Sequence, residues 1–146
     1  MAPKVSEQYL EERRNQILDA AVATFSRNGL HKTTIEDIRL EAGLSRGAVY
    51  HYFKSKEDII DAIRGRSARQ AEAIYSDRDE ADDADSMLLD LIDATVSKMV
   101  SPDSVDADRL ALFLWDESLV NKRIMDGQMT AFKPWLALVA ECLRKA

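Results

Sequence analysis

Residues 42–56 combine side chains suited to nucleic-acid binding with a local absence of acids. The window AGLSRGAVYHYFKSK contains Arg46, Lys54 and Lys56 and no acidic residue, although the chain has a formal net charge of −6. A guanidinium can bond guanine edges or phosphate, and aromatic faces can meet thymine methyl groups. On charge alone, an ordinary solvated face would look the same. Whether these side chains act together therefore depends on the elements that carry them.

Two short helices and the turn between them are expected to present this window. Thr33 and Glu36 have the spacing of a capping box for a helix that stops at Gly43. After a turn of about three residues, Ser45 can cap a second helix over residues 46–53. Two helices joined by a short turn that contains glycine are typical of a helix-turn-helix, whose second helix lies in the major groove of DNA.

The outward side of that second helix supplies most of the candidate binding groups. Val49 and Phe53 are expected to face the core, while Gly47 and Ala48 lack bulk and would let the helix approach a groove closely. Helix N-termini add backbone amides that bind phosphate oxygens. The predicted DNA-binding residues are Thr34, Ser45, Arg46, Gly47, Ala48, Tyr50, His51, Tyr52 and Lys56. As alternatives, Tyr50 or Tyr52 would cover the core, and Thr34 and Ser45 would serve only as caps.

Helical periodicity continues on both sides of this motif. An amphipathic pattern covers residues 11–27, and a fourth helix is expected from Lys56 to about Tyr75. Gly65 interrupts that helix and is a plausible hinge. Residues 76–86 contain no large apolar side chain and have the composition of a solvated linker. The 5 glycines and 3 prolines are too few for the many hairpins of an all-β protein, so the predicted fold class is all-α.

The second half of the chain is acidic and also rich in methionine and tryptophan. Residues 1–75 carry 12 Lys/Arg and 11 Asp/Glu, whereas residues 76–146 carry 8 and 15. Helical patterns are expected at about 87–100, 105–121 and 127–146, and Pro134 should kink or shorten the last. Flexible thioethers and wide indole rings suit an adaptable pocket, although ordinary core filling is the alternative. The candidate ligand-binding residues are Met87, Leu91, Met99, Phe113, Trp115, Met129 and Trp135.

The segment from about Arg13 to Ile63 resembles the N-terminal DNA-binding domain of the TetR family of transcriptional regulators. It contains ILDAA, TTIEDI, EAGLSRG and YHYFKSKEDI in the order and at the spacing of that family. The family's usual DNA contacts fall on the nine residues named above. Arg39 and Leu40 depart from the pattern, because the family prefers a small residue after the isoleucine.

The resemblance implies a three-helix DNA-binding head with a helix-turn-helix, over residues 9–64. A fourth helix would link this head to a helical ligand-binding and dimerisation domain over residues 65–146, apparently short of the family's last helices. It also implies a homodimer that binds a palindromic operator on double-stranded DNA and represses until a small-molecule effector releases it. The alternative is a truncated interaction protein that heterodimerises with, or modulates, a full-length regulator.

Other classes of function find little support in the residues. His31 and His51 are the two histidines, Cys142 is the one cysteine, and no spacing suggests paired carboxylates, a phosphate loop or metal ligands. The sequence therefore predicts no enzyme, no cofactor and no metal site. With no secretory h-region and no apolar run of about 20 residues, we expect a cytoplasmic protein with no membrane partner.

Overall fold

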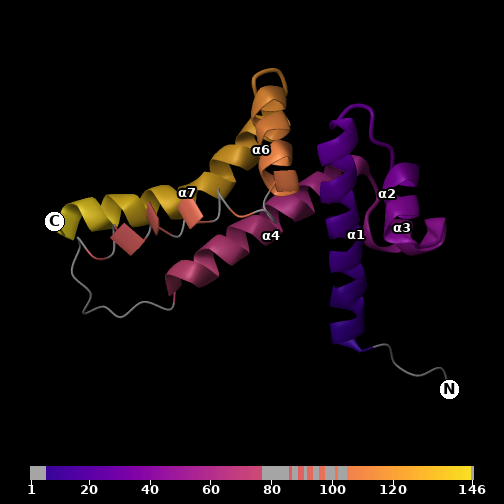
Figure 1. The fold of residues 1–146 in the computed structure, drawn as a ribbon, viewed down its shortest axis with the longest axis horizontal. Helices are drawn as coiled ribbons and strands as arrows, with labels where there is room; N and C mark the ends of the chain where they lie inside the picture. Colours follow the sequence, from indigo (N-terminus) through magenta and orange to yellow (C-terminus); the bar gives the residue numbers. More distant parts are fainter. Residues whose placement is uncertain are drawn as a thin grey trace. The chain divides into compact units, whose positions relative to one another are not determined.

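The computed structural model describes residues 6–76, 86, 89–90, 92–93, 96–97, 101 and 105–145. The elements of this described part are helices (Figure 1). They are α1 (Glu7–Asn28), α2 (Ile35–Ala42), α3 (Arg46–Tyr52), α4 (Lys56–Ser76), α6 (Val105–Ser118) and α7 (Lys122–Lys145). The all-α fold class is thereby confirmed. The chain divides into two compact units, Met1–Ile63 and Arg64–Ala146, which are taken in turn below.

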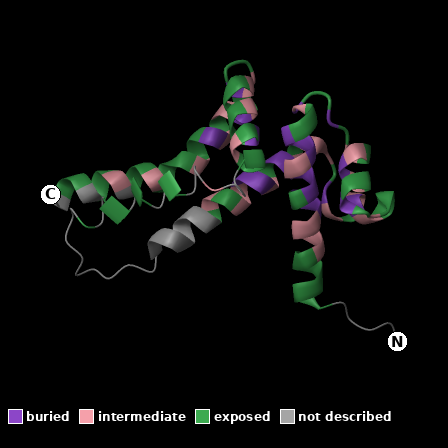
Figure 2. Cartoon of the chain, viewed as in Figure 1, coloured by how far each residue is buried: buried purple, intermediate pink, exposed green. Residues whose placement is uncertain are grey.

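The first unit has a core of aliphatic and aromatic side chains that α1 organises. Its fully buried apolar residues are Ile17, Leu18, Ala21 and Phe25 of α1, Ile38 of α2, Val49 of α3 and Ile59 of α4. The α1 members recur every three or four residues, so they form one stripe of the helix, and Figure 2 colours that stripe as buried. Burying each large side chain contributes about 1.5–3 kcal/mol. This core fixes α2 and α3 against α1.

Helix α1 is longer at its start than the apolar pattern predicts. The Ser6 hydroxyl accepts a hydrogen bond from the Tyr9 amide at 3.2 Å, so the helix begins at Glu7 rather than near residue 11. Its end follows the sequence closely. Gly29 has φ +80°, and its amide donates to the Phe25 carbonyl at 2.8 Å. A capping serine therefore extends a helix through a turn that buries nothing.

The capping box of α2 lies one residue later than predicted. Thr34 is the N-cap, its hydroxyl accepts from the Asp37 amide at 3.2 Å, and the Asp37 carboxylate accepts from the Thr34 amide at 2.8 Å. The predicted pair of Thr33 and Glu36 is wrong. Thr33 is buried, and its hydroxyl donates to the Gly29 carbonyl at 2.8 Å instead of capping the helix.

In the second unit, α6 and α7 pack against each other as a helical hairpin, and residues 119–121 join them. Leu110, Leu114 and Ile124 are its buried apolar side chains among the described residues. Arg64 is also buried, and its Nη1 donates to the Ile124 carbonyl at 3.0 Å. A charged side chain of the α4 segment is thereby held against the first turns of α7.

Neither Gly65 nor Pro134 ends its helix. Helix α4 continues through Gly65 to Ser76, close to the predicted end near Tyr75, and α7 starts at Lys122 and continues through Pro134 to Lys145, so the expectation that Pro134 shortens the helix is wrong. Pro134 is exposed, so the carbonyl that loses its helical partner can bond water. Most of residues 76–100, which include the expected linker and the first helical pattern of the second half, lie outside the described residues.

Candidate nucleic-acid interface

A tight turn sets the angle between α2 and α3. Gly43 adopts the left-handed conformation (φ +65°, ψ +29°), and its amide donates to the Leu40 carbonyl at 3.1 Å. The Leu44 amide donates to the Arg39 carbonyl at 3.2 Å, which completes a glycine-terminated helix end. Ser45 then caps α3 by accepting from the Ala48 amide at 3.2 Å. These residues build the helix-turn-helix that the spacing predicts.

Helix α3 has one buried and one open side. Val49 is fully buried, and Phe53, directly after the helix, is 4% exposed. Phe53 is therefore the aromatic residue that covers the core, rather than Tyr50 or Tyr52. The candidate binding residues gather on the other side of the helix: Ser45, Arg46, Gly47 and His51 are exposed, and Ala48, Tyr50 and Tyr52 are half-buried.

Aromatic contacts order the open side of α3. The Arg46 guanidinium lies over the Tyr50 ring, with Cζ 5.5 Å from the ring centroid. His51 and Tyr52 meet edge to face at 5.1 Å between ring centroids. Gly47 has open space where a Cβ would project, so the first turn of α3 presents an unobstructed backbone. A planar cation and polar aromatic edges on one short helix are groups that read base edges in a groove.

The side chains of Thr34 and Lys56, two of the predicted DNA-binding residues, already donate hydrogen bonds within the head. The Thr34 hydroxyl donates to the Asp37 carboxylate at 2.7 Å while it caps α2. The Lys56 ammonium donates to the carbonyls of Leu30 at 2.8 Å and Thr33 at 3.3 Å. A phosphate contact donated by Thr34 would therefore compete with a bond that the folded head already makes, whereas the Lys56 ammonium has a third N–H donor beyond these two bonds.

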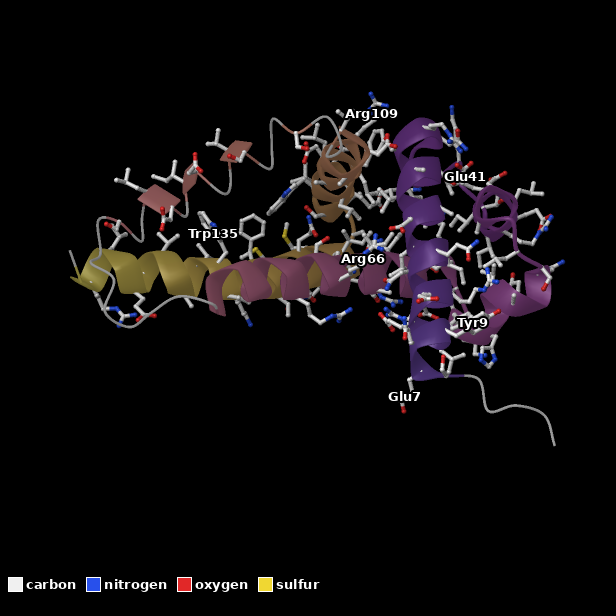
Figure 3. The ribbon with its side chains drawn as sticks, turned by 60° about the horizontal axis from the view of Figure 1, so that its bottom comes forward. Glu7, Tyr9, Glu41, Arg66, Arg109 and Trp135 are labelled. Atoms are coloured by element: carbon white, nitrogen blue, oxygen red, sulfur yellow. The ribbon has the colours of Figure 1, made fainter. Side chains whose placement is uncertain are left out.

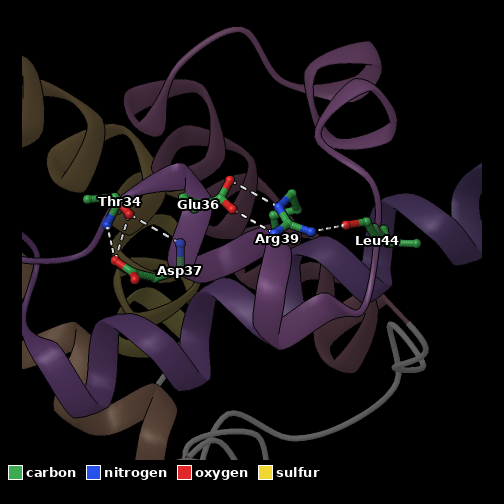
Figure 4. A network of polar contacts seen from close by, with 5 residues as sticks. All are labelled: Thr34, Glu36, Asp37, Arg39 and Leu44. Atoms are coloured by element: carbon green, nitrogen blue, oxygen red, sulfur yellow. Dashed lines mark hydrogen bonds and ion pairs between the residues drawn. The ribbon is translucent and has the colours of Figure 1, made fainter.

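A polar network that sequence reasoning did not identify lies beside the turn (Figure 4). The Arg39 guanidinium donates to both carboxylate oxygens of Glu36, at 3.0 Å from Nε and 2.6 Å from Nη2. Its Nη1 donates to the Leu44 carbonyl at 3.0 Å. The bond from Arg39 lowers the pKa of the Glu36 carboxyl, and Glu36 in turn raises the pKa of Arg39. The spacing of Glu36 and Arg39, three residues apart on a helix, was the available signal.

The candidate ligand-binding residues are only partly described. Met87, Leu91 and Met99 lie outside the described residues. Trp115 and Met129 are exposed, while Phe113 and Trp135 are half-buried; Trp135 is labelled in Figure 3. Phe132, which was not among the candidates, joins the two indoles edge to face: its ring centroid lies 5.4 Å from that of Trp115 and 5.9 Å from that of Trp135.

Known proteins share the head of this chain. Residues 17–63 match the family described as "Bacterial regulatory proteins, tetR family". The HTH-type transcriptional repressor Rv1474c of Mycobacterium tuberculosis is 38% identical over 74 residues, which are 51% of this chain and 40% of that protein. The HTH-type transcriptional regulator HbdR of an Aromatoleum species is 34% identical over 127 residues, 79% of this chain and 56% of that protein. The matches therefore span less than two thirds of these relatives.

Solved structures share the fold over most of the chain. A regulator from Saccharomonospora viridis, solved in complex with choline, is 28% identical with a TM-score of 0.76 and covers 92% of this chain and 70% of that one. GusR of Salmonella enterica has a TM-score of 0.73 at 24% identity, which speaks for the fold alone. None of the described helices is long and apolar enough to cross a membrane. Residues 17–63 thus carry the N-terminal domain of the family of bacterial regulatory proteins that is named after tetR.

Proposed function

We propose that this chain is a transcriptional repressor that reads DNA through the open side of α3. The observation that carries the proposal is the division of that helix. Val49 anchors it in the core, while Arg46, Gly47 and His51 are exposed on a short helix that directly follows the helix-turn-helix turn. Relatives that share the head are named HTH-type transcriptional repressors or regulators, which supports the regulatory class over an enzyme.

The repressor acts as a homodimer on a palindromic operator. Two copies of α3 would enter successive major grooves about 34–36 Å apart. Exposed apolar side chains on α7 support a protein–protein contact in the second unit. They include Met129, Phe132, Leu136 and Leu143, which are 40–63% exposed. Contiguous apolar surface of this kind marks an interaction site more often than it remains in water.

A small-molecule effector binds the second unit and releases the DNA. Such release requires an effector that binds the DNA-free state more tightly than the DNA-bound state. Choline in the related regulator makes an organic cation the first class to test, and the rings of Trp115, Phe132 and Trp135 are groups that attract such cations. Heat-unfolding curves in choline and in its uncharged analogue 3,3-dimethylbutanol test this class. A midpoint that rises only with choline supports it, and equal effects contradict it.

The experiment for the main proposal selects duplexes from a random library with the full chain. Binding of the selected site and of an unrelated duplex is then measured over a range of salt concentrations for wild type, Tyr50→Ala and Lys56→Ala. We expect Tyr50→Ala to relax sequence preference, because it removes a base-facing ring. We expect Lys56→Ala to weaken binding to all sequences, with a salt slope smaller by about 0.9 if its ammonium neutralises one phosphate.

Tyr9 offers a matched control within the same unit. A guanidinium also lies over the Tyr9 ring, with Arg13 Cζ 5.1 Å from the ring centroid. Tyr9, however, belongs to α1 rather than to α3. Tyr9→Ala should leave sequence preference unchanged. Equal binding by wild type, Tyr50→Ala and Lys56→Ala would contradict the assignment of the site to α3. If the wild-type chain enriches no sequence from the random library, sequence-specific DNA binding itself is contradicted.

A further inference from the structure

The Arg39 side chain joins α2 to the turn, in addition to the backbone bond from the Leu44 amide to the Arg39 carbonyl. Arg39 lies on α2, its carboxylate partner Glu36 lies one turn earlier on the same helix, and its second partner is the carbonyl of Leu44 in the turn. The turn has few residues with which to fix its own conformation, because only Gly43, Leu44 and Ser45 separate the two helices. A bond from α2 to the middle of that turn therefore restrains where α3 begins.

The geometry favours a restraint over a direct contact with DNA. A guanidinium has five N–H donors, and Arg39 uses three of them within the head. The two bonds to Glu36 hold the plane of the guanidinium, and this fixed plane aims Nη1 at the Leu44 carbonyl. The side chain is 24% exposed, whereas that of Glu36 is 55% exposed. Arg39 is thus oriented towards the turn rather than towards solvent.

We propose that Arg39 is a positioning residue for DNA reading: together with Glu36 it holds the Leu44 carbonyl, and it thereby sets the pose of the first turn of α3. Base-edge contacts depend on that pose, because they require correct distances and angles to particular atoms. Binding to unrelated DNA depends mainly on the number of neutralised phosphates and is insensitive to it. The inference rests on the proposed function, since it assigns Arg39 a part in reading DNA.

The test compares Arg39→Met, Arg39→Lys and Glu36→Gln with wild type on the selected site and on an unrelated duplex. Arg39→Met keeps an unbranched apolar stem but removes every bond to Glu36 and Leu44. We expect it to weaken the selected site about tenfold, the loss of roughly one charge-assisted hydrogen bond, with the unrelated duplex and the salt slope unchanged. Arg39→Lys keeps one donor group for the Leu44 carbonyl and should recover part of the lost affinity. The affinity of Glu36→Gln for the selected site should lie between those of wild type and Arg39→Met.

Arg27 provides a matched control for the lost charge. It also forms an ion pair with a residue of α2, with Nη2 2.5 Å from Glu41 Oε2, but it comes from α1 and this pair holds the helix rather than the turn. Arg27→Met should leave the ratio between the two duplexes unchanged. Heat unfolding of each variant ensures that binding is compared well below every midpoint.

Each outcome decides between explanations. If Arg39→Met weakens both duplexes and lowers the salt slope by about one, Arg39 contacts phosphate and the positioning role is wrong. The positioning role is also wrong if Arg39→Met prefers the selected site over the unrelated duplex as strongly as wild type does. It is equally wrong if Arg27→Met loses as much of that preference as Arg39→Met. Both results leave the proposed function intact. If wild type selects no sequence, the proposed function fails, and the role of Arg39 fails with it.

Discussion

Gly65 and Gly127 are both interior helix glycines of the second unit, yet an added methyl group should affect them in opposite ways. Among the described residues, a Cβ at Gly65 would meet Arg69 Nη1 at an ordinary 3.5 Å, whereas one at Gly127 would lie 2.5 Å from Arg64 Cζ and 2.8 Å from Nη2. Since alanine favours a helix by about 1 kcal/mol over glycine, Gly65→Ala should raise the stability of this unit. Gly127→Ala gains the same helix preference but should lower the stability, because the buried Arg64 guanidinium must move away from the Ile124 carbonyl to which it donates. Denaturant unfolding monitored by tryptophan fluorescence measures both changes, and equal signs would contradict this account.

Gly65→Ala also tests the hinge predicted at that position. The variant should reduce release of DNA by an effector if bending at Gly65 transmits the signal, because alanine resists leaving the helical conformation. Unchanged release, measured as the effector concentration that frees half of the DNA, would contradict the hinge. This readout is separate from stability, so one variant addresses both questions.

At the residue scale, the sequence predicts which side of a helix is buried better than it predicts the hydrogen-bond partner of a given side chain. The outward and inward sides of α3 follow from spacing alone, because Val49 and Phe53 are its apolar anchors. The pairing of Arg39 with Glu36 could have been predicted from their spacing of three residues on a helix. The bond from Arg39 to the Leu44 carbonyl depends on the folded turn, which no local spacing specifies.

The capping box of α2 predicts a pH dependence for the head. The Thr34 hydroxyl and amide bond the Asp37 carboxylate and lower its pKa below the usual 3.8. A carboxyl whose pKa is lower in the folded state stabilises the fold above its unfolded pKa, and this contribution is lost as the pH falls through the folded value. Asp37→Asn should therefore lower the unfolding midpoint at pH 7, and the difference from wild type should begin to shrink as the pH falls below about 4 and vanish only below the folded pKa.

Thr34→Ala is the companion variant for this prediction. It removes the hydroxyl that caps α2, a loss worth about 1 kcal/mol. Since Asp37 and Thr34 bond each other, the double variant should lose less stability than the two single losses added together. A difference between wild type and Asp37→Asn that persists unchanged into acid would show that the charge is not what Thr34 stabilises.

Element boundaries show where local patterns fail. Thr33 with Glu36 and Thr34 with Asp37 both satisfy the spacing of a capping box, and local sequence cannot choose between them. The choice is made by burial, because Thr33 donates to the Gly29 carbonyl inside the head. The early start of α1 at Glu7 has another cause, since its first turn is polar and exposed and carries no apolar signal. Helix α7 passes through Pro134 at an exposed position, where the carbonyl that loses its partner can bond water.

At the scale of the whole molecule, the apolar stripe of α7 predicts self-association. Met129, Phe132, Leu136 and Leu143 recur at helical spacing and are exposed in the single chain. Light scattering behind a sizing column should give twice the chain mass of 16.5 kDa. The double variant Leu136→Glu/Leu143→Glu should be a monomer, because two charges would have to be buried. Leu40→Glu, at an exposed leucine of the head, is the control that should leave the dimer intact.

A monomeric wild type would contradict the homodimer and favour the alternative in which the chain pairs with a longer regulator. A stable dimer with the wild-type stripe, disrupted only by the α7 variant, would instead support two copies of α3 on one operator. The mass measurement thus separates the two proposals about partners without any knowledge of the operator or the effector.

Helix α4 belongs to both compact units, since the division after Ile63 falls within its span of Lys56–Ser76. The two units are therefore connected by a continuous helix rather than by a linker, so the number of residues at the boundary sets a rotation as well as a distance. Each residue inserted there would turn everything that follows by about 100° and advance it by about 1.5 Å. Two whole turns, about seven residues, would nearly restore the original phase at a greater separation. A fusion of this head to a different second unit therefore has to keep the helical phase of α4. One residue too many or too few would rotate the second unit by about 100° around the helix axis.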